Sequence, residues 1–249
     1  MTLGCDYSWG RPSPMALYQA GYRFACRYLT GGGKALDSQE AALLQLNGLA
    51  IVLNYEIAAD PSNGVGDAQA ALAAVNALGV PVDRPIYFSI DTGSDPDCAQ
   101  YFSGVRSVCG DRTGAYGGDD TLRTAQSQGA KWFWRSNAWH NTPFQGAHIQ
   151  QRLQQDFGGS IDVDDALQDD FGQWPAPAHS GGGGTFNVGD DELAWLVAGP
   201  PGTTAYVVRA DLSSKQGVAS LADWQGLQFL GYKQITLSPQ QLKAIPTSG

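Results

Sequence analysis

Up to about residue 174, the chain alternates short apolar runs with amphipathic segments in which Ala, Leu and Gln recur at helical spacing. This alternation is typical of repeated βα units, whose parallel strands are covered by the helices that connect them. The pattern predicts strands at residues 3–7, 23–28, 50–55, 86–90, 113–117, 131–134, 147–150 and 160–163. It predicts helices at residues 13–20, 38–47, 66–78, 96–109 and 119–128.

Eight strands with intervening helices indicate a (β/α)₈ barrel. The predicted barrel has about 170 residues, which is short for a fold that usually takes about 250. Beyond residue 129 the connections between strands are too short for complete helices. We therefore expect an α/β fold in which residues 1–174 form a small TIM-like barrel with abbreviated late helices.

Residues 175–184 combine closely spaced prolines with four consecutive glycines, a composition that predicts a linker. Residues 185–249 are then expected to form a small C-terminal α/β module. Within this module we expect a helical turn or edge strand at 190–196, a strand at 205–209, and helices at 220–229 and 237–244. Cell-wall attachment and self-association are both open as its role.

Four acidic residues each follow a short apolar run: Asp6, Glu56, Asp91 and Asp162. Any one of them could cap a helix or open a turn. In a parallel barrel, however, the carboxyl ends of the strands meet at one face, where active sites lie. A charge at the end of a buried strand is costly unless it faces a cleft. The four acids together therefore predict one shared catalytic pocket.

Hydrolysis of a glycosidic bond needs a proton donor and a second carboxylate across the scissile bond. Glu56 and Asp91 follow consecutive strands, and closure of the barrel should bring Asp162 beside Asp6. Crowded carboxylates cannot all ionise freely, so at least one should have a raised pKa and act as the general acid. Glu56 and Asp91 are the candidates for that role.

Aromatic residues accompany the acids at or near the strand ends, where sugar rings can stack on them. The candidates for substrate binding are Tyr7, Trp9, Tyr28, Tyr55, Tyr87, Tyr116, Trp134 and Trp139. About half of such side chains are expected to pack within the barrel or under the helices. Tyr7, Trp9 and Trp139 are the ones that we expect to face the substrate.

Charge and segment lengths exclude several classes of partner. The net charge is −9, and the 15 basic residues form no cluster of the kind that binds nucleic acid. No apolar stretch is long enough to cross a bilayer, so we expect no membrane insertion. The amino terminus runs from Met1 directly into a strand, which predicts a soluble protein made in the cytoplasm without a secretory signal, acting at the cell wall after release.

The residues that commonly bind metals are few. Cys5 and Cys26 fall on consecutive predicted strands, and we expect buried free thiols there rather than a disulfide. The three histidines make no ligand pair of familiar spacing, so we expect neither a metal nor a cofactor. The glycines before Lys34 lack the spacing of a phosphate-binding loop and predict a βα turn.

Several short segments together resemble a known family. They are Gly4-Cys5-Asp6-Tyr7-Ser8, Arg27-Tyr28-Leu29, Asn54-Tyr55-Glu56 and Pro85-Ile86-Tyr87-Phe88-Ser89-Ile90-Asp91. In this order they resemble the DUF1906, or Rv2525c-like, glycoside hydrolase-like domain, a relative of the family 25 lysozymes. The resemblance runs from residue 4 to about residue 170 and implies a TIM-like barrel and a glycan substrate. Such domains occur in actinobacterial proteins and in lysins of their phages.

One departure from the lysozyme pattern concerns the fourth strand, where the family 25 lysozymes carry Asp-x-Glu. This chain has Ser89-Ile90-Asp91, so Asp91 would replace the acid and Ser89 its helper, with Glu56 as compensation. The leading hypothesis is an endolysin-type muramidase that cleaves peptidoglycan. Asp91 or Glu56 would be its proton donor and the other its base or nucleophile, while Asp6 and Asp162 would position water and stabilise positive charge.

Two other functions stay open. One is a glycan-binding or structural phage or cell-surface protein that keeps the barrel without turnover, and the missing Asp-x-Glu favours it. The other is a hydrolase of a different cell-surface glycan. The stereochemical outcome and the oligomeric state stay open as well, because a sequence gives no distance between carboxylates.

Overall fold

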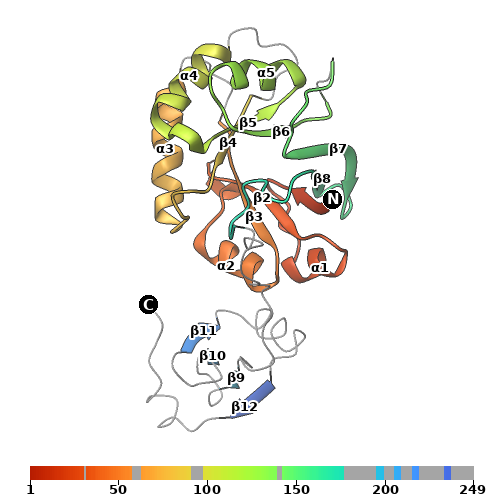
Figure 1. Cartoon of the computed structure of the whole chain (residues 1–249). Helices are drawn as coiled ribbons and strands as arrows, with labels where there is room; N and C mark the ends of the chain where they lie inside the picture. The colour runs from red at the N-terminus through yellow and green to blue at the C-terminus, as the bar shows by residue number, and fades with distance from the viewer. Residues whose placement is uncertain are drawn as a thin grey trace. The chain divides into compact units, whose positions relative to one another are not determined.

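The structure is a computed structural model that describes residues 1–30, 32–57, 63–90, 98–138 and 142–176, and four further strands near the carboxyl terminus. The chain divides into two compact units, Met1–Pro177 and Ala178–Gly249 (Figure 1). Within the described residues, no helix has both the length and the apolar character needed to cross a membrane.

The first unit is built on eight strands that close into a barrel in the order of the sequence. These strands are β1 (Thr2–Asp6), β2 (Phe24–Tyr28), β3 (Ala50–Tyr55), β4 (Ile86–Ser89), β5 (Thr113–Gly117), β6 (Trp132–Arg135), β7 (Ile149–Asp156) and β8 (Ile161–Ala166). Each of the eight predicted strands is present, and the predicted small α/β barrel is confirmed.

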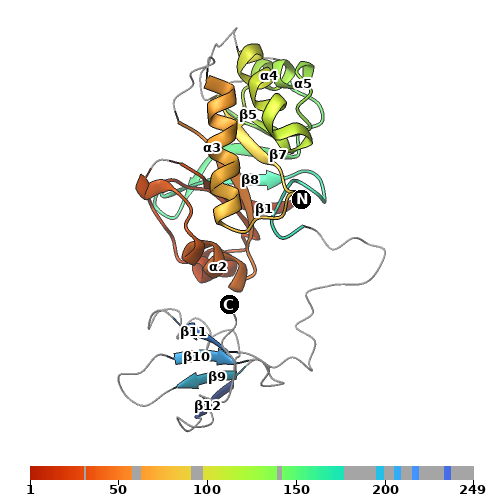
Figure 2. The ribbon, with the colours of Figure 1, turned by 90° about the vertical axis from the view of Figure 1, so that its left-hand side faces the viewer.

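The helices of the barrel also follow the predicted pattern. They are α1 (Pro14–Gln19), α2 (Ser38–Leu46), α3 (Gly64–Ala77), α4 (Cys98–Cys109) and α5 (Asp119–Ser127), with short 3₁₀ turns η1 (Gly32–Lys34) and η3 (Gly110–Arg112). Helix α3 packs along α4, and α4 contacts α5 (Figure 2). Within the described residues of this unit, no helix follows α5, which confirms that the late helices are abbreviated.

The last strand differs from the prediction in its direction. Strands β1 to β7 are parallel, but β8 runs antiparallel to both of its neighbours, β7 and β1. Parallel strands need a crossover of a dozen or more residues, whereas a tight turn at residues 157–160 joins β7 to β8. Phe157, Gly158 and Gly159 all have positive φ angles in this turn. It leaves no room for a crossover helix.

The antiparallel direction of β8 changes the explanation for the position of Asp162. Asp162 lies at the beginning of β8 rather than at its carboxyl end. Because β8 is antiparallel to β1, its beginning lies next to the carboxyl end of β1, and Asp162 is paired with Asp6. Asp162 therefore lies beside Asp6, as expected. The expectation that Asp162 ends a parallel strand was wrong.

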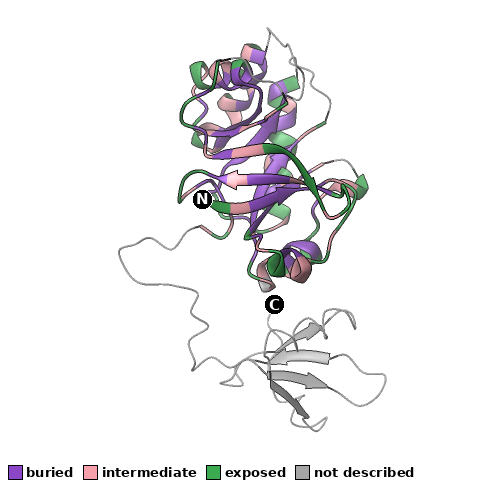
Figure 3. Ribbon diagram, turned by 90° about the vertical axis from the view of Figure 1, so that its right-hand side faces the viewer, coloured by how far each residue is buried: buried purple, intermediate pink, exposed green. Residues whose placement is uncertain are grey.

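The apolar core has two layers, one on each face of the barrel wall. The larger layer lies between the strands and the helices, and the smaller one fills the barrel interior. Figure 3 shows that buried residues make up most of the barrel strands. The interior layer consists of Phe24, Cys26, Val52, Tyr87, Tyr116, Trp134, Ile149, Ala166 and Phe171. Gly4 makes room for it, since a Cβ atom there would lie 2.1 Å from the Phe24 ring.

All four cysteines are buried and carry free thiols, as predicted for Cys5 and Cys26. Cys5 belongs to the layer under the helices and Cys26 to the barrel interior, so the two side chains lie on opposite faces of the wall.

The second unit contains a four-stranded sheet. Its strands are β9 (Trp195–Ala198), β10 (Ala205–Val208), β11 (Lys215–Val218) and β12 (Lys233–Thr236), in the spatial order β11-β10-β9-β12. Strand β10 confirms the strand predicted there. Strand β9 has a neighbour on each side and is not the predicted edge strand. The predicted helices at 220–229 and 237–244, and most of the linker, lie outside the described residues.

Candidate active site

Polar and aromatic side chains line the barrel interior near the carboxyl ends of β1 to β7. Side chains two residues apart on a strand point to the same face. A residue two positions along a strand from a member of the interior apolar layer therefore also faces the barrel interior. The inward-facing residues at this end are Asp6, Tyr28, Asn54, Ser89, Tyr116, Trp134 and Gln151, joined by Asp162 and Asp164 of β8. We call these nine residues the polar ring.

Two carboxyl groups of the polar ring are almost completely enclosed. Asp6 is 4% exposed and Asp164 is 0% exposed. Gln151 Nε2 donates to Asp6 Oδ2 at 2.8 Å, and Tyr116 Oη donates to Gln151 Oε1 at 3.0 Å. Trp134 Nε1 donates to Asp164 Oδ1 at 2.9 Å. Each carboxyl group is therefore held in one orientation by a side chain from the second strand along the barrel wall.

The enclosure changes the protonation of both acids. Burial, opposed by the hydrogen bond from Gln151 and reinforced by the charge of Asp162, raises the pKa of Asp6 to about 7. Burial and the neighbouring charge of Asp6 raise the pKa of Asp164 well above its ordinary value. Burial therefore favours the protonated form of both acids, and Asp6 exchanges its proton near pH 7. Such a carboxyl group can act as a general acid under physiological conditions.

Glu56 supplies a more accessible carboxylate directly after β3. Its side chain is 24% exposed, and Lys34 Nζ lies 3.0 Å from Glu56 Oε1. Lys34 Nζ also lies 4.5 Å from the centre of the Tyr28 ring. Burial and then the charges of Asp6 and Glu56 raise the pKa of Tyr28, so its phenol stays protonated. Tyr28 thus lies between the two acids, within the electrostatic influence of both.

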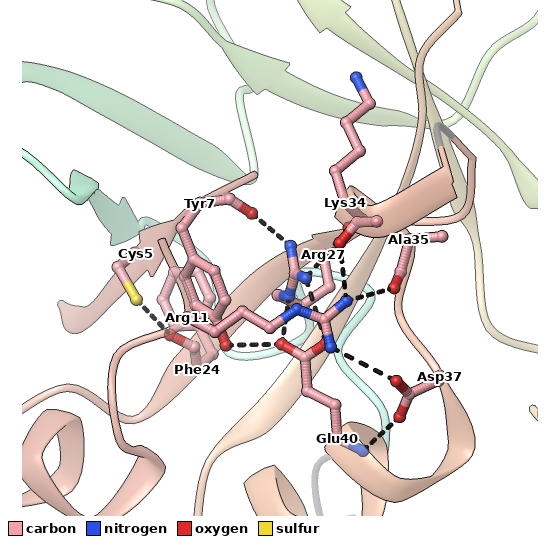
Figure 4. A network of polar contacts seen from close by, with 10 residues as sticks. Cys5, Tyr7, Arg11, Phe24, Arg27, Lys34, Ala35, Asp37 and Glu40 are labelled. Atoms are coloured by element: carbon pink, nitrogen blue, oxygen red, sulfur yellow. Dashed lines mark hydrogen bonds and ion pairs between the residues drawn. The ribbon is translucent and has the colours of Figure 1, made fainter. Parts of the chain in front are cut away.

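A buried ion pair between Arg27 and Glu40, on the helix side of the barrel wall, fixes the backbone near Asp6 and at Lys34 (Figure 4). Arg27 is fully buried, and its Nε donates to Glu40 Oε1 at 2.7 Å. The same guanidinium donates to the carbonyl oxygen of Tyr7 and, at 3.1 Å, to that of Lys34. Arg27 therefore ties the residue that follows Asp6 to the residue that pairs with Glu56.

The predicted aromatic residues fall into three groups. Tyr28, Tyr116 and Trp134 belong to the polar ring. Tyr7 and Tyr55 lie in the layer under the helices, where Tyr7 Oη donates to Glu40 Oε1 at 3.1 Å. Tyr87 is inside the barrel, but its hydroxyl donates to the carbonyl oxygen of Phe171 at 2.7 Å.

Trp9 is 69% exposed, and its ring lies against the turn that precedes Lys34, because a Cβ atom at Gly33 would be 3.2 Å from it. Of the remaining predicted residues, Asp91 and Trp139 lie outside the described residues. The structure thus brings Asp6, Glu56 and Asp162 to one end of the barrel.

Four residues at this end were not predicted from the sequence: Lys34, Asn54, Gln151 and Asp164. Asp164 could have been found from alternation, because it lies two residues after Asp162 on the same strand and must share its face. Lys34 was assigned only to a turn. Asn54 and Gln151 carry no pattern of their own that distinguishes them from polar surface residues.

A closed α/β barrel with carboxyl groups gathered at the carboxyl ends of its strands defines the class of glycoside hydrolase-like barrels. The family model described as "Rv2525c-like, glycoside hydrolase-like domain" matches residues 15–192, and the chain belongs to this family. The resemblance noted in the sequence is confirmed.

Solved structures agree with this assignment. The Mycobacterium tuberculosis Tat-secreted protein Rv2525c in complex with L-tartrate is 28% identical, with a TM-score of 0.64 over 70% of this chain and 98% of that one. In complex with HEPES it is 30% identical, with a TM-score of 0.63 over the same shares. An uncharacterized B. stearothermophilus protein shares the fold at 16% identity and a TM-score of 0.54, over 67% and 96% of the chains. No curated protein sequence matches the chain.

Proposed function

We propose that the barrel hydrolyses glycosidic bonds in a cell-surface glycan, with peptidoglycan as the expected substrate. The observation that carries this proposal is the buried pair of Asp6 and Asp164, which places a carboxyl group with a pKa of about 7 beside further carboxylates. A proton donor and a second carboxylate are what glycoside hydrolysis requires.

In this proposal Asp6 donates the proton to the leaving oxygen, and Glu56 is the second carboxylate. The sequence favoured Glu56 or Asp91 as the donor, but burial supports Asp6, since Glu56 is paired with Lys34 and partly open to solvent. Asp164 is fully buried, so Asp6, with a pKa of about 7, is the group assigned to exchange the proton. Asp162 lies opposite Asp6 on β8 and adds negative charge that stabilises an oxocarbenium-like transition state. Asp91 stays a candidate from the sequence alone.

The cell-wall substrate is supported by the family's resemblance to lysozymes. The relative Rv2525c is a Tat-secreted protein, which supports action outside the cytoplasm. Residues 185–249 would hold the enzyme on the wall during an endolysin-type reaction.

The test is release of reducing ends from purified actinobacterial peptidoglycan by the full chain. Asp6→Asn and Glu56→Gln should each lower the rate by about 100-fold or more, because each removes one half of the acid–base pair. Asp91→Asn tests the candidate from the sequence. Asp111→Asn is the control, because Asp111 is exposed and lies just before β5, at the other end of the barrel. Full release by both the Asp6 and the Glu56 variants would rule the assignment out.

A second candidate is a glycan-binding protein without turnover. The observation that favours it is Ser89, which occupies the place of a lysozyme carboxylate and donates to Asn54 Oδ1 at 2.9 Å. Such a protein would sediment with purified cell walls and release no reducing sugar from them. Release that depends on Asp6 would exclude it.

A further inference from the structure

Two hydrogen-bond donors of the polar ring have no acceptor among the residues that the structure describes. Asn54 is 1% exposed, and its Nδ2 has no hydrogen-bond partner. The hydroxyl of Tyr28 makes no hydrogen bond with any described residue, and burial keeps it protonated. Leaving a buried amide donor unpaired costs about 1–3 kcal/mol, so such a group is expected to have a partner in the functional complex.

These two donors are neighbours on the barrel wall. Tyr28 of β2 and Asn54 of β3 are directly paired in the strand register, and both face inward. Ser89 holds the amide of Asn54 in place through its carbonyl oxygen, which directs the Nδ2 group away from β4. Lys34 lies over the Tyr28 ring and restrains that side chain. The pair is therefore fixed before any ligand arrives.

The ligand group that binds the Tyr28 hydroxyl and the Asn54 amide must accept two hydrogen bonds. Two adjacent donors suit an oxygen that accepts two hydrogen bonds and donates none, which is a carbonyl oxygen. A sugar hydroxyl would bring its own hydrogen and would be better matched by the carboxylates of the polar ring. In a glycan, the carbonyl group nearest to the glycosidic bond is that of an acetamido substituent.

We propose that Tyr28 and Asn54 form a two-donor subsite that binds the acetamido carbonyl oxygen of an N-acetylated sugar residue. This inference rests on the proposed glycan substrate and assigns the residues that select it. It gives Asn54 and Tyr28 a role in specificity, separate from the proton transfer assigned to Asp6.

Binding of two trisaccharides to the full chain tests the inference without requiring turnover. Tri-N-acetylchitotriose carries acetamido groups, and cellotriose carries hydroxyls in their place. In isothermal titration calorimetry the wild type should prefer the N-acetylated ligand. Tyr28→Phe and Asn54→Ser should each weaken that ligand by about two- to tenfold, the value of one neutral hydrogen bond, and leave cellotriose unchanged. Tyr18→Phe, on the exposed side of α1, should bind both ligands as the wild type does.

Tyr28→Phe keeps the ring under Lys34 and so remains informative if Asn54→Ser does not fold. Equal affinity of the wild type for the two trisaccharides, no binding of the N-acetylated one, or equal losses for both ligands in the variants would overturn the inference. Failure of the proposed hydrolysis would appear separately, as binding without release of reducing ends.

Discussion

The replacement Asp6→Asn should remove most of the pH dependence of stability that Asp6 causes. The pKa of Asp6 rises from 3.8 to about 7 on folding, mainly because the side chain is buried. Between these two values the native state holds a proton that the unfolded state has lost. Stability therefore falls as the pH rises through this window, and the loss is complete above about pH 7.

The size of the effect follows from the shift. A change of about three pKa units corresponds to about 4 kcal/mol, at about 1.4 kcal/mol for each unit. Because Asp6 is almost fully enclosed, solvent screening reduces this value little. Asparagine at this position can still accept the hydrogen bond from Gln151 through its side-chain carbonyl oxygen. The variant should thus match the wild type near pH 4 and exceed its stability near pH 8.

Urea denaturation at half-unit steps between pH 4.5 and pH 8 measures this difference. The free energy of unfolding of Asp6→Asn, minus that of the wild type, should increase steadily with pH and level off above about pH 7. A constant difference across the range would show that Asp6 does not hold a proton in the folded barrel, and would remove the basis for its role as the acid.

Three further outcomes are expected. If Asp6 donates the proton, kcat/KM for peptidoglycan should fall about tenfold per pH unit above about pH 7, and a rate that stays constant to pH 9 would contradict this role. Glu40→Gln should cost about 3–5 kcal/mol in urea denaturation, because it leaves the buried charge of Arg27 without its counterion, and a loss below 1 kcal/mol would refute this reasoning. Gly4→Ala should cost about 1–3 kcal/mol, since its Cβ would overlap the Phe24 ring, and an unchanged denaturation midpoint would show that the ring moves freely.

Strands such as β3 and β4 were predictable because each is a nearly continuous apolar run buried on both faces. The direction of β8 was not predictable, since the residues of a strand do not reveal which way it runs relative to its neighbours. The information lay instead in the turn before it, where two consecutive glycines follow Phe157. A tight turn of this kind favours a hairpin and excludes a crossover helix.

The candidate site was predictable to the extent that it lies at strand ends. Asp6 and Glu56 were found because they directly follow apolar runs. The buried carboxyl group whose pKa Asp6 raises is Asp164, which a strand-end criterion overlooks because it lies inside β8. Tyr7 and Tyr55 illustrate the opposite error: they lie at strand ends, but their side chains alternate onto the face that carries the helices.

The pairing of the first strand with the last makes formation of the site depend on the order in which the chain is synthesised and folds. Asp6 and Gln151 are 145 residues apart, yet they share a hydrogen bond. During synthesis β1 emerges first and acquires its second neighbour only when β8 has followed, so closure is a late, long-range step. The carboxyl pair of Asp6 and Asp164 forms at that step. A chain whose barrel is still open therefore lacks the paired acids. If the proposed hydrolysis depends on this pair, its rate should therefore report completed folding.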